Sequence, residues 1–195
     1  MTRDPARQLA GTALTEFGER LKRRRTISEF KALSVPVELL LQGIEVARWA
    51  PNHRLTEPWH FYLLGQESVD RLLDLIIEIN AADKDETARA AMIKRLDRIP
   101  GWFVVTCKRN ADALKEREDY AACCCAVHNL VSYLWQGGVG VKWTTGAVTR
   151  DDRCAGLLGA APAAEFIVGL FQYGYPERVP EQQRREVHAI CTQLE

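Results

Sequence analysis

The sequence lacks an excess of either charge and lacks any long apolar run. Its 195 residues carry 26 basic and 26 acidic side chains, so the formal net charge at pH 7 is zero. Proteins that bind nucleic acid through its phosphates usually carry a basic excess, so we expect no nucleic-acid partner. No stretch approaches the roughly 18 apolar residues that cross a bilayer, and the first residues lack the apolar core of a secretory signal. We therefore expect a cytoplasmic protein that does not enter membranes.

The common metal-binding and nucleotide-binding patterns are also missing. None of the six cysteines forms a C-x-x-C pair, and the run Cys123–Cys125 would point in three directions on a helix, so we interpret these cysteines as reduced packing residues. The histidines do not lie at metal-chelating spacing. The glycines at 137–140 precede an expected strand, and no G-K-[ST] follows them, which excludes both the P-loop and the dinucleotide fingerprint. We predict no metal site and no catalytic acid–base pair.

The sequence does contain a regular alternation of helical and extended patterns. The apolar spacing predicts strands at 59–64, 102–107, 140–145 and 165–173, and helices at 6–23, about 36–50, 67–80, 85–98, 115–136 and 150–158. Strands separated by helices are typical of a layered α and β domain. Because no repeat and no Gly/Ser linker divides the chain, we expect a single domain over residues 1–195, with a polar C-terminal arm from about residue 177.

A basic run follows the first predicted helix and reads Arg23-Arg24-Arg25-Thr26-Ile27-Ser28. Guanidinium groups match phosphate oxygens, and neighbouring hydroxyls complete a phosphate cradle. The same run also complements the negative end of a helix dipole while facing solvent. The residues alone leave both interpretations open.

Two further segments lie where ligands commonly bind. The loop from Ala50 to Trp59 is stiffened by two prolines and places polar residues between an apolar helix and a buried strand, as many binding loops do; a rigid surface turn is the alternative. The segment Trp143-Thr144-Thr145-Gly146 ends a strand with hydroxyl and backbone N–H groups. A glycine-capped helix followed by a plain strand explains that segment equally well.

Taken together, the order and spacing of these motifs resemble the FMN-dependent nitroreductase family, from about residue 20 to residue 186. The residues that carry the resemblance are Arg24-Arg25-Thr26-Ile27-Ser28-Glu29-Phe30, then Ala50-Pro51 with Pro58-Trp59-His60-Phe61, then Trp143-Thr144-Thr145-Gly146, and finally Gly174-Tyr175-Pro176. The resemblance is closest to the compact branch of the family. It implies an α+β fold with three α/β/α layers, a central mixed but largely antiparallel sheet, and an extended homodimer with FMN at the subunit interface.

The resemblance also implies a set of cofactor-binding residues. Arg24, Arg25 and Thr26 would hold the FMN phosphate and ribityl end, with Ser28 nearby, and Arg184 or Arg185 would reach the phosphate from the tail. The loop residues Pro51, Asn52 and His53 would cover part of the flavin. Trp143, Thr144 and Thr145 would contact the ring, with the backbone N–H of Thr145 or Gly146 near flavin N5.

The implied activity is hydride transfer from NADH or NADPH, through flavin N5, to a nitroaromatic, a quinone or a similar small acceptor. No catalytic side chain is needed, because the flavin carries the hydride. The chain departs from the family pattern at Leu55, Glu57 and Ser28, where the family often has Asn, Gln and a second basic residue. The alternatives are another flavin reaction (dehalogenation, dehydrogenation or flavin cleavage), a flavin or thiol redox sensor using Cys123–Cys125, and an interaction module using the basic run.

Overall fold

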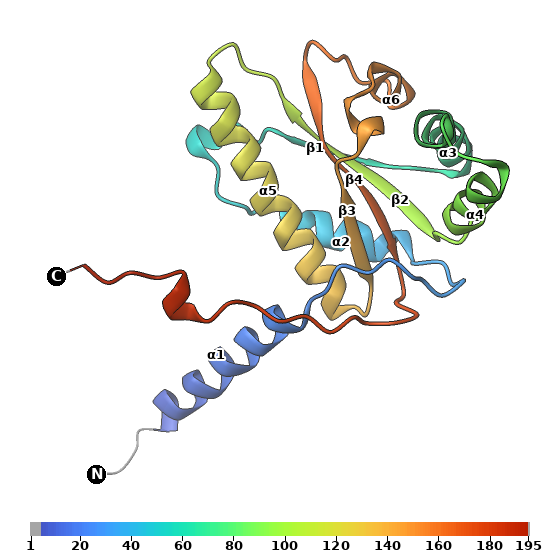
Figure 1. Ribbon diagram of the computed structural model, residues 1–195. Helices are drawn as coiled ribbons and strands as arrows, with labels where there is room; N and C mark the ends of the chain where they lie inside the picture. Colours follow the sequence, from blue (N-terminus) through green and yellow to red (C-terminus); the bar gives the residue numbers. More distant parts are fainter. Residues whose placement is uncertain (1–4, 195) are drawn as a thin grey trace.

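The computed structural model describes residues 5–194 and contains one antiparallel sheet with the strand order β1-β2-β4-β3 (Figure 1). Its strands are β1 (Trp59–Leu63), β2 (Gly101–Lys108), β3 (Gly140–Thr144) and β4 (Glu165–Gly174). The three ladders that join them are all antiparallel. A parallel bridge between Thr26 and Val141 at the free edge of β3 supplies the mixed character that was expected. The predicted strand positions are confirmed.

Helices cover both faces of the sheet, which confirms the three-layer α/β/α arrangement (Figure 1). One face carries α2 (Val37–Ala47) and α5 (Ala113–Gln136), and the other carries α3 (Gln66–Ala81), α4 (Glu86–Leu96) and α6 (Asp152–Leu157). The core on the α5 side includes Phe103, Leu130 and Phe171, which are almost completely buried. The core on the α4 side includes Leu72 and Trp102. Side chains of each strand alternate between these two cores.

Local sequence signals set the bounds of α5, the longest helix. Asp112 caps its first turn by accepting hydrogen bonds from the backbone N–H groups of Leu114 and Lys115 at 3.0 and 3.3 Å. Gly138, with φ of 79°, reverses the chain after the helix end and leads into β3. The helix before Pro51 ends at Ala47, three residues before the predicted end at Ala50, because a turn separates it from the proline.

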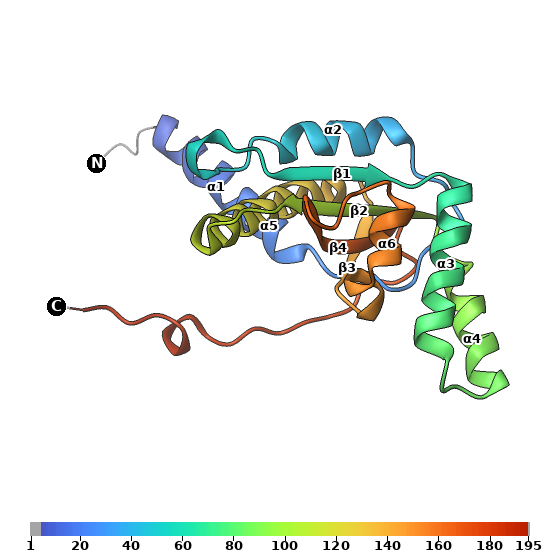
Figure 2. The same cartoon turned by 90° about the horizontal axis from the view of Figure 1, so that it is seen from above.

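Both ends of the described chain extend from this layered body (Figures 1 and 2). Helix α1 (Pro5–Arg23) projects away from the sheet, and the residues that follow β4 run outward to a short turn of 3₁₀ helix at Val187–Ala189. Both segments carry large apolar side chains that are exposed: Leu14, Phe17, Leu21, Val179, Val187, Ile190 and Leu194. Within residues 5–194, no helix is long and apolar enough to cross a bilayer.

The chain between α1 and α2 is fixed against the free edge of β3 and the end of β4. The backbone N–H of Ile27 donates to the carbonyl of Val141 at 3.3 Å, and that of Lys31 donates to the carbonyl of Tyr175 at 2.8 Å. Ile27 is completely buried and packs directly on Gly140, where an added Cβ would lie 2.3 Å from its Cγ1 atom. The basic run is therefore held in one position along β3.

Candidate functional site

Three arginines from opposite ends of the chain form a cluster of positive charge. Burial, followed by the charges of Arg184 and Arg25, lowers the pKa of Arg24. The Arg25 guanidinium donates to the backbone carbonyl of Arg24 at 2.9 Å, and Arg184 donates to the side chain of Gln182 at 3.0 Å. In the described part of the chain, none of these arginines has a carboxylate within ion-pair distance. The described residues supply no counter-charge to this cluster. Of the two candidate tail arginines, Arg184 is the one that lies close to Arg24, and Arg185 is not.

Hydroxyl groups lie just beyond this cluster, where the phosphate interpretation expects them. Thr26 sits at the bridge to Val141, and its side chain is exposed. Ser28 is also exposed and lines a groove that continues toward α4. Thr26 thus lies beside Val141 on β3, and the chain then passes Ser28 and pairs Phe30 with Pro176, just after β4.

Trp143 presents a fixed aromatic surface near the end of the same strand. Its indole N–H donates to the carbonyl of Val168 at 3.1 Å, and its ring lies 5.2 Å from that of Phe171. The indole covers Gly169 so closely that an added Cβ there would lie 2.0 Å from Nε1. Because 37% of the Trp143 surface remains accessible, the ring is immobilised but still able to contact a ligand.

The turn after β3 offers two free backbone donors. The hydroxyl of Thr144 is used internally, since it donates to the carbonyl of Leu170 at 2.8 Å. The carbonyls of Thr145 and Gly146 accept hydrogen bonds from Arg150 and Thr149, at 3.4 and 3.1 Å, which orients the turn. Over residues 5–194, neither Thr145 nor Gly146 donates its own backbone N–H to a protein acceptor. These exposed donors are suited to an anionic or electron-rich ligand atom.

The loop from Pro51 to Glu57 adopts a costly backbone conformation. Arg54, Leu55 and Glu57 have φ values of 60°, 52° and 42°, in the left-handed region that non-glycine residues rarely occupy. Asparagine tolerates this region better than leucine, which gives the departure at Leu55 a local conformational cost. The Leu55 side chain is 81% exposed, so internal packing does not offset that cost.

Hydrogen bonds to the start of α5 hold this loop in place. His53 Nδ1 lies 2.9 Å from a carboxylate oxygen of Glu118, and the hydroxyl of Thr56 donates to Asp119 at 2.6 Å. The side-chain oxygen of Asn52 accepts from the backbone N–H of Glu57 at 3.0 Å. The side chains of Asn52, His53 and Thr56 therefore have hydrogen-bond partners within their own chain.

The structure does not bring the loop and the arginine cluster of one chain together. The loop contacts α5 at Glu118 and Asp119, whereas the arginines lie beside the start of β3, just after α5 ends at Gln136 (Figure 1). The helix from Asp119 to Gln136 spans about 25 Å at 1.5 Å per residue. Trp143, Thr145 and Gly146 lie along the same β3 edge as the arginines. The predicted site residues thus fall into two separate groups.

The structure adds two cations that the motifs did not indicate. Burial, followed by the charge of Arg95, lowers the pKa of Lys142, which lies on β3 between the two ends of the predicted site. Lys142 falls within the Gly-rich motif, but strand alternation places its side chain on the α4 side, opposite Trp143. Arg95 belongs to the helix predicted at 85–98, a segment in which the motifs indicate no site residue. Their proximity depends on the packing of α4 over the sheet, which no local pattern indicates.

Comparison with known proteins identifies the family to which this fold belongs. The sequence pattern of the nitroreductase family matches residues 21–175. A protein of Bacillus subtilis strain 168, provisionally named NAD(P)H nitroreductase YfhC, is 28% identical over 169 residues, covering 85% of this chain and 87% of YfhC. Iodotyrosine deiodinase 1 of Pongo abelii is 28% identical over 204 residues, covering 92% of this chain and 68% of the deiodinase.

Solved structures share the architecture. The crystal structure of the FMN-dependent nitroreductase NfnB of Mycobacterium smegmatis, in complex with NADPH, superposes with a TM-score of 0.76 at 16% identity, covering 93% of this chain and 100% of that one. The layers, the strand order and the family pattern over most of the chain lead to the same conclusion. The chain belongs to the nitroreductase family.

Proposed function

We propose that this chain is an FMN-dependent oxidoreductase that takes hydride from NADH or NADPH and delivers it to a nitroaromatic, a quinone or a similar acceptor. The observation that carries the proposal is the pairing of two features on one sheet edge: unneutralised arginines at its start and free backbone donors at its end. The names of YfhC and NfnB, which specify NAD(P)H and FMN, support the cofactor and the donor.

The residues present fit both ends of FMN. Arg24, Arg25 and Arg184 supply the charge-assisted donors that a phosphate group requires, and their own chain leaves them without a carboxylate. From Val141, beside Thr26, to Thr145 the β3 edge runs about 13 Å, a separation comparable to the length of one FMN molecule. At the far end, the exposed indole of Trp143 and the N–H groups of Thr145 and Gly146 match an aromatic ring with polar edges.

FMN, when bound, supplies the hydride chemistry at its N5 atom. In this proposal the protein's residues bind and orient. Arg24, Arg25 and Arg184 fix the phosphate, while Trp143 limits the access of water to the ring. Thr145 and Gly146 aim backbone N–H groups at the reacting edge, where fixed dipoles stabilise developing charge without reorganising. No side-chain proton donor is assigned.

The separation of the loop from the arginine cluster favours sites shared between two copies of the chain. An FMN molecule at the β3 edge lies away from Pro51, Asn52 and His53 of the same chain, because that loop leads into β1 at the opposite edge of the sheet and is hydrogen-bonded to the start of α5. A second copy that brings its loop to this edge would complete the site. The exposed apolar side chains on α1 and the tail are then available to bind that copy. We therefore propose a homodimer with FMN at its interface.

The test is a visible spectrum of the purified protein, before and after addition of FMN, combined with its mass in solution. We expect yellow protein at twice 22.0 kDa whose flavin absorbance is bleached anaerobically by NADH or NADPH and returns on addition of a nitroaromatic or a quinone. Protein that remains colourless in excess FMN would contradict the flavin assignment. A stable monomer that binds FMN would contradict the shared site alone.

A second flavin reaction, reductive dehalogenation, is favoured by the similarity to iodotyrosine deiodinase 1. Bleaching by NAD(P)H followed by reoxidation with a halotyrosine, but not with nitro compounds or quinones, would select it. The thiol-sensor alternative finds less support: a hydrogen bond with Cys107, together with burial, raises the pKa of Cys123 and keeps it a thiol. The interaction-module alternative is also weakened, because Arg24 is partly buried.

A further inference from the structure

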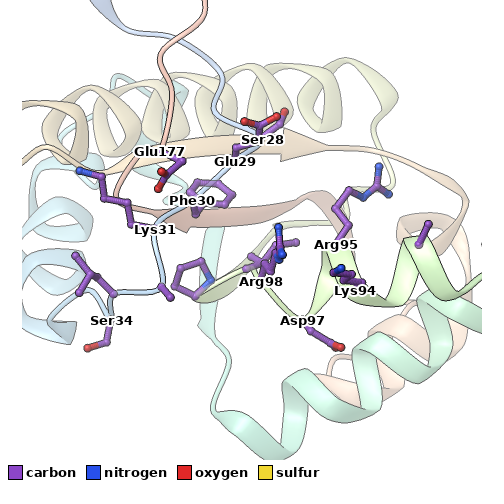
Figure 3. A pocket seen from close by; sticks show the side chains of 15 residues that line it. Ser28, Glu29, Phe30, Lys31, Ser34, Lys94, Arg95, Asp97, Arg98 and Glu177 are labelled. Atoms are coloured by element: carbon purple, nitrogen blue, oxygen red, sulfur yellow. The ribbon is translucent and has the colours of Figure 1, made fainter.

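A groove of about 1200 Å³ runs between the segment Ser28–Ser34 and the last two turns of α4 (Figure 3). Its size exceeds the 300–1,000 Å³ that is typical of pockets for drug-sized ligands. Ser28 lines one end, so the groove opens beside the residues assigned to FMN, while Ile99 and Pro100 lie farther along it. A molecule that reacts at the flavin and carries a long substituent would have room for that substituent here.

The α4 wall of the groove is cationic. Ala91, Lys94 and Arg95 recur at the three- and four-residue spacing that places side chains on one face of a helix, and Arg98 follows in the turn after α4. Figure 3 shows Arg95 and Arg98 directed between α4 and the opposite segment. For the chain from residue 5 to residue 194, none of these three cations takes part in an ion pair or a side-chain hydrogen bond.

Lys142 on the sheet lies near Arg95, although it does not itself line the groove. It is half-buried on β3, and burial together with the neighbouring charge of Arg95 lowers its pKa. Placing two cations close together with partial desolvation is unfavourable unless an anion joins them. The favourable effect of a basic residue at the end of a helix accounts for Lys94 and Arg95 on α4, but it does not account for Lys142.

Carboxylates near the groove do not neutralise the α4 wall. Glu29 and Glu177 lie on the opposite wall, on segments that are hydrogen-bonded to each other, with Lys31 beside them (Figure 3). Asp97 points toward α3 and also lines a second groove, between α3 and α4, together with Arg89 and Ile93. The two grooves therefore use two faces of α4, and the cations gather on the face next to Ser28.

We propose that this groove binds the 2′-phosphate of NADPH, and so makes NADPH the preferred donor. This inference rests on the proposed function, because the nicotinamide must reach the flavin ring near Trp143 while the adenosine end of the same molecule extends past Ser28 into the groove. A dianionic phosphate monoester can accept hydrogen bonds from several cations at once, whereas a single carboxylate uses fewer of them. The 2′-phosphate is the group that distinguishes NADPH from NADH, and the groove offers a cationic wall within reach of the same site.

The test compares the double variant Lys94→Gln/Arg98→Gln with Arg89→Gln in the FMN-loaded protein. Arg89 is the matched control, since it lies on α4 with Lys94, is exposed and faces the other groove. We expect the ratio of kcat/KM for NADPH to that for NADH to fall by about tenfold or more in the double variant. The ratio should stay within about twofold of the unmodified protein in Arg89→Gln.

A binding measurement keeps the inference separate from the activity. Titration with adenosine 2′,5′-bisphosphate and with 5′-AMP should show tighter binding of the bisphosphate, and the double variant should lose that difference. If neither donor bleaches the flavin but the bisphosphate still binds through Lys94 and Arg98, the proposed function fails and the phosphate site stands. An unchanged donor ratio together with equal binding of the two nucleotides in all three proteins would overturn the inference.

Discussion

The two groups of predicted site residues differ in how their polar groups are satisfied. The loop at the start of α5 is complete in itself: Thr56 and His53 are paired with Asp119 and Glu118, and the strained backbone is held by those contacts. The arginines beside β3 crowd together without a carboxylate. The loop keeps its shape through contacts within its own chain, whereas the arginine cluster lacks a counter-charge, so an anion bound there would lower its free energy.

The largest expected effect tests the arginine cluster. Arg24→Gln should weaken FMN binding by about 10- to 100-fold, because a hydrogen bond to a charged group contributes roughly 1.5–3 kcal/mol. The measurement is a fluorescence titration of FMN into the flavin-free protein.

Arg20→Gln is the matched control for this variant. Arg20 is an exposed residue of α1 whose contact is a 4.0 Å pair with Glu16 within the same helix. Equal losses of affinity in the two variants would indicate a general effect of net charge and would remove the phosphate role from Arg24.

The loop should respond through stability. Thr56→Val removes the hydroxyl that donates to Asp119, a carboxylate that is only 6% exposed. Leaving a buried charged acceptor with one donor fewer should lower the free energy of unfolding by about 1–2 kcal/mol. Urea denaturation of the flavin-free protein measures this change.

Thr87→Val provides the comparison for the loop variant. Thr87 is exposed in the first turn of α4, so its replacement should change the unfolding free energy by no more than about 0.5 kcal/mol. If both variants lose the same stability, the contact between Thr56 and Asp119 is not what holds the loop.

Much of the fold could be predicted because its signals are local. Asp112 and the glycines at 137–138 mark the ends of α5, and the apolar runs that became β1 and β2 are bounded by proline or glycine. The shortened end of α2 shows the usual limit, since the turn before Pro51 takes three residues that the apolar pattern alone assigns to the helix.

The charge environment of the site could not be predicted in the same way. Arg24 and Arg184 are 160 positions apart and meet only because the tail returns past β3, so the sequence left Arg184 and Arg185 equivalent. The proximity of Lys142 to Arg95 depends on how α4 packs over the sheet. The left-handed backbone of Leu55 and Glu57 is also invisible in a pattern of residue types, because it is imposed by contacts with α5.

The smallest expected effect is a change in the free energy of unfolding at the arginine cluster. Its sign is opposite to the change expected at the loop. In the flavin-free protein, Arg24→Gln should raise the free energy of unfolding by a few tenths of a kcal/mol, because it relieves the repulsion by Arg184 and Arg25 while solvent screens most of it. Raising the NaCl concentration from about 0.1 to about 1 M shortens the Debye length from roughly 10 to 3 Å, so the difference between variant and unmodified protein should shrink as salt increases. Urea denaturation at both salt concentrations measures this difference. A loss of stability in Arg24→Gln at low salt would mean that Arg24 makes a net favourable contact within its own chain, and the contrast between an incomplete cluster and a self-sufficient loop would then be wrong.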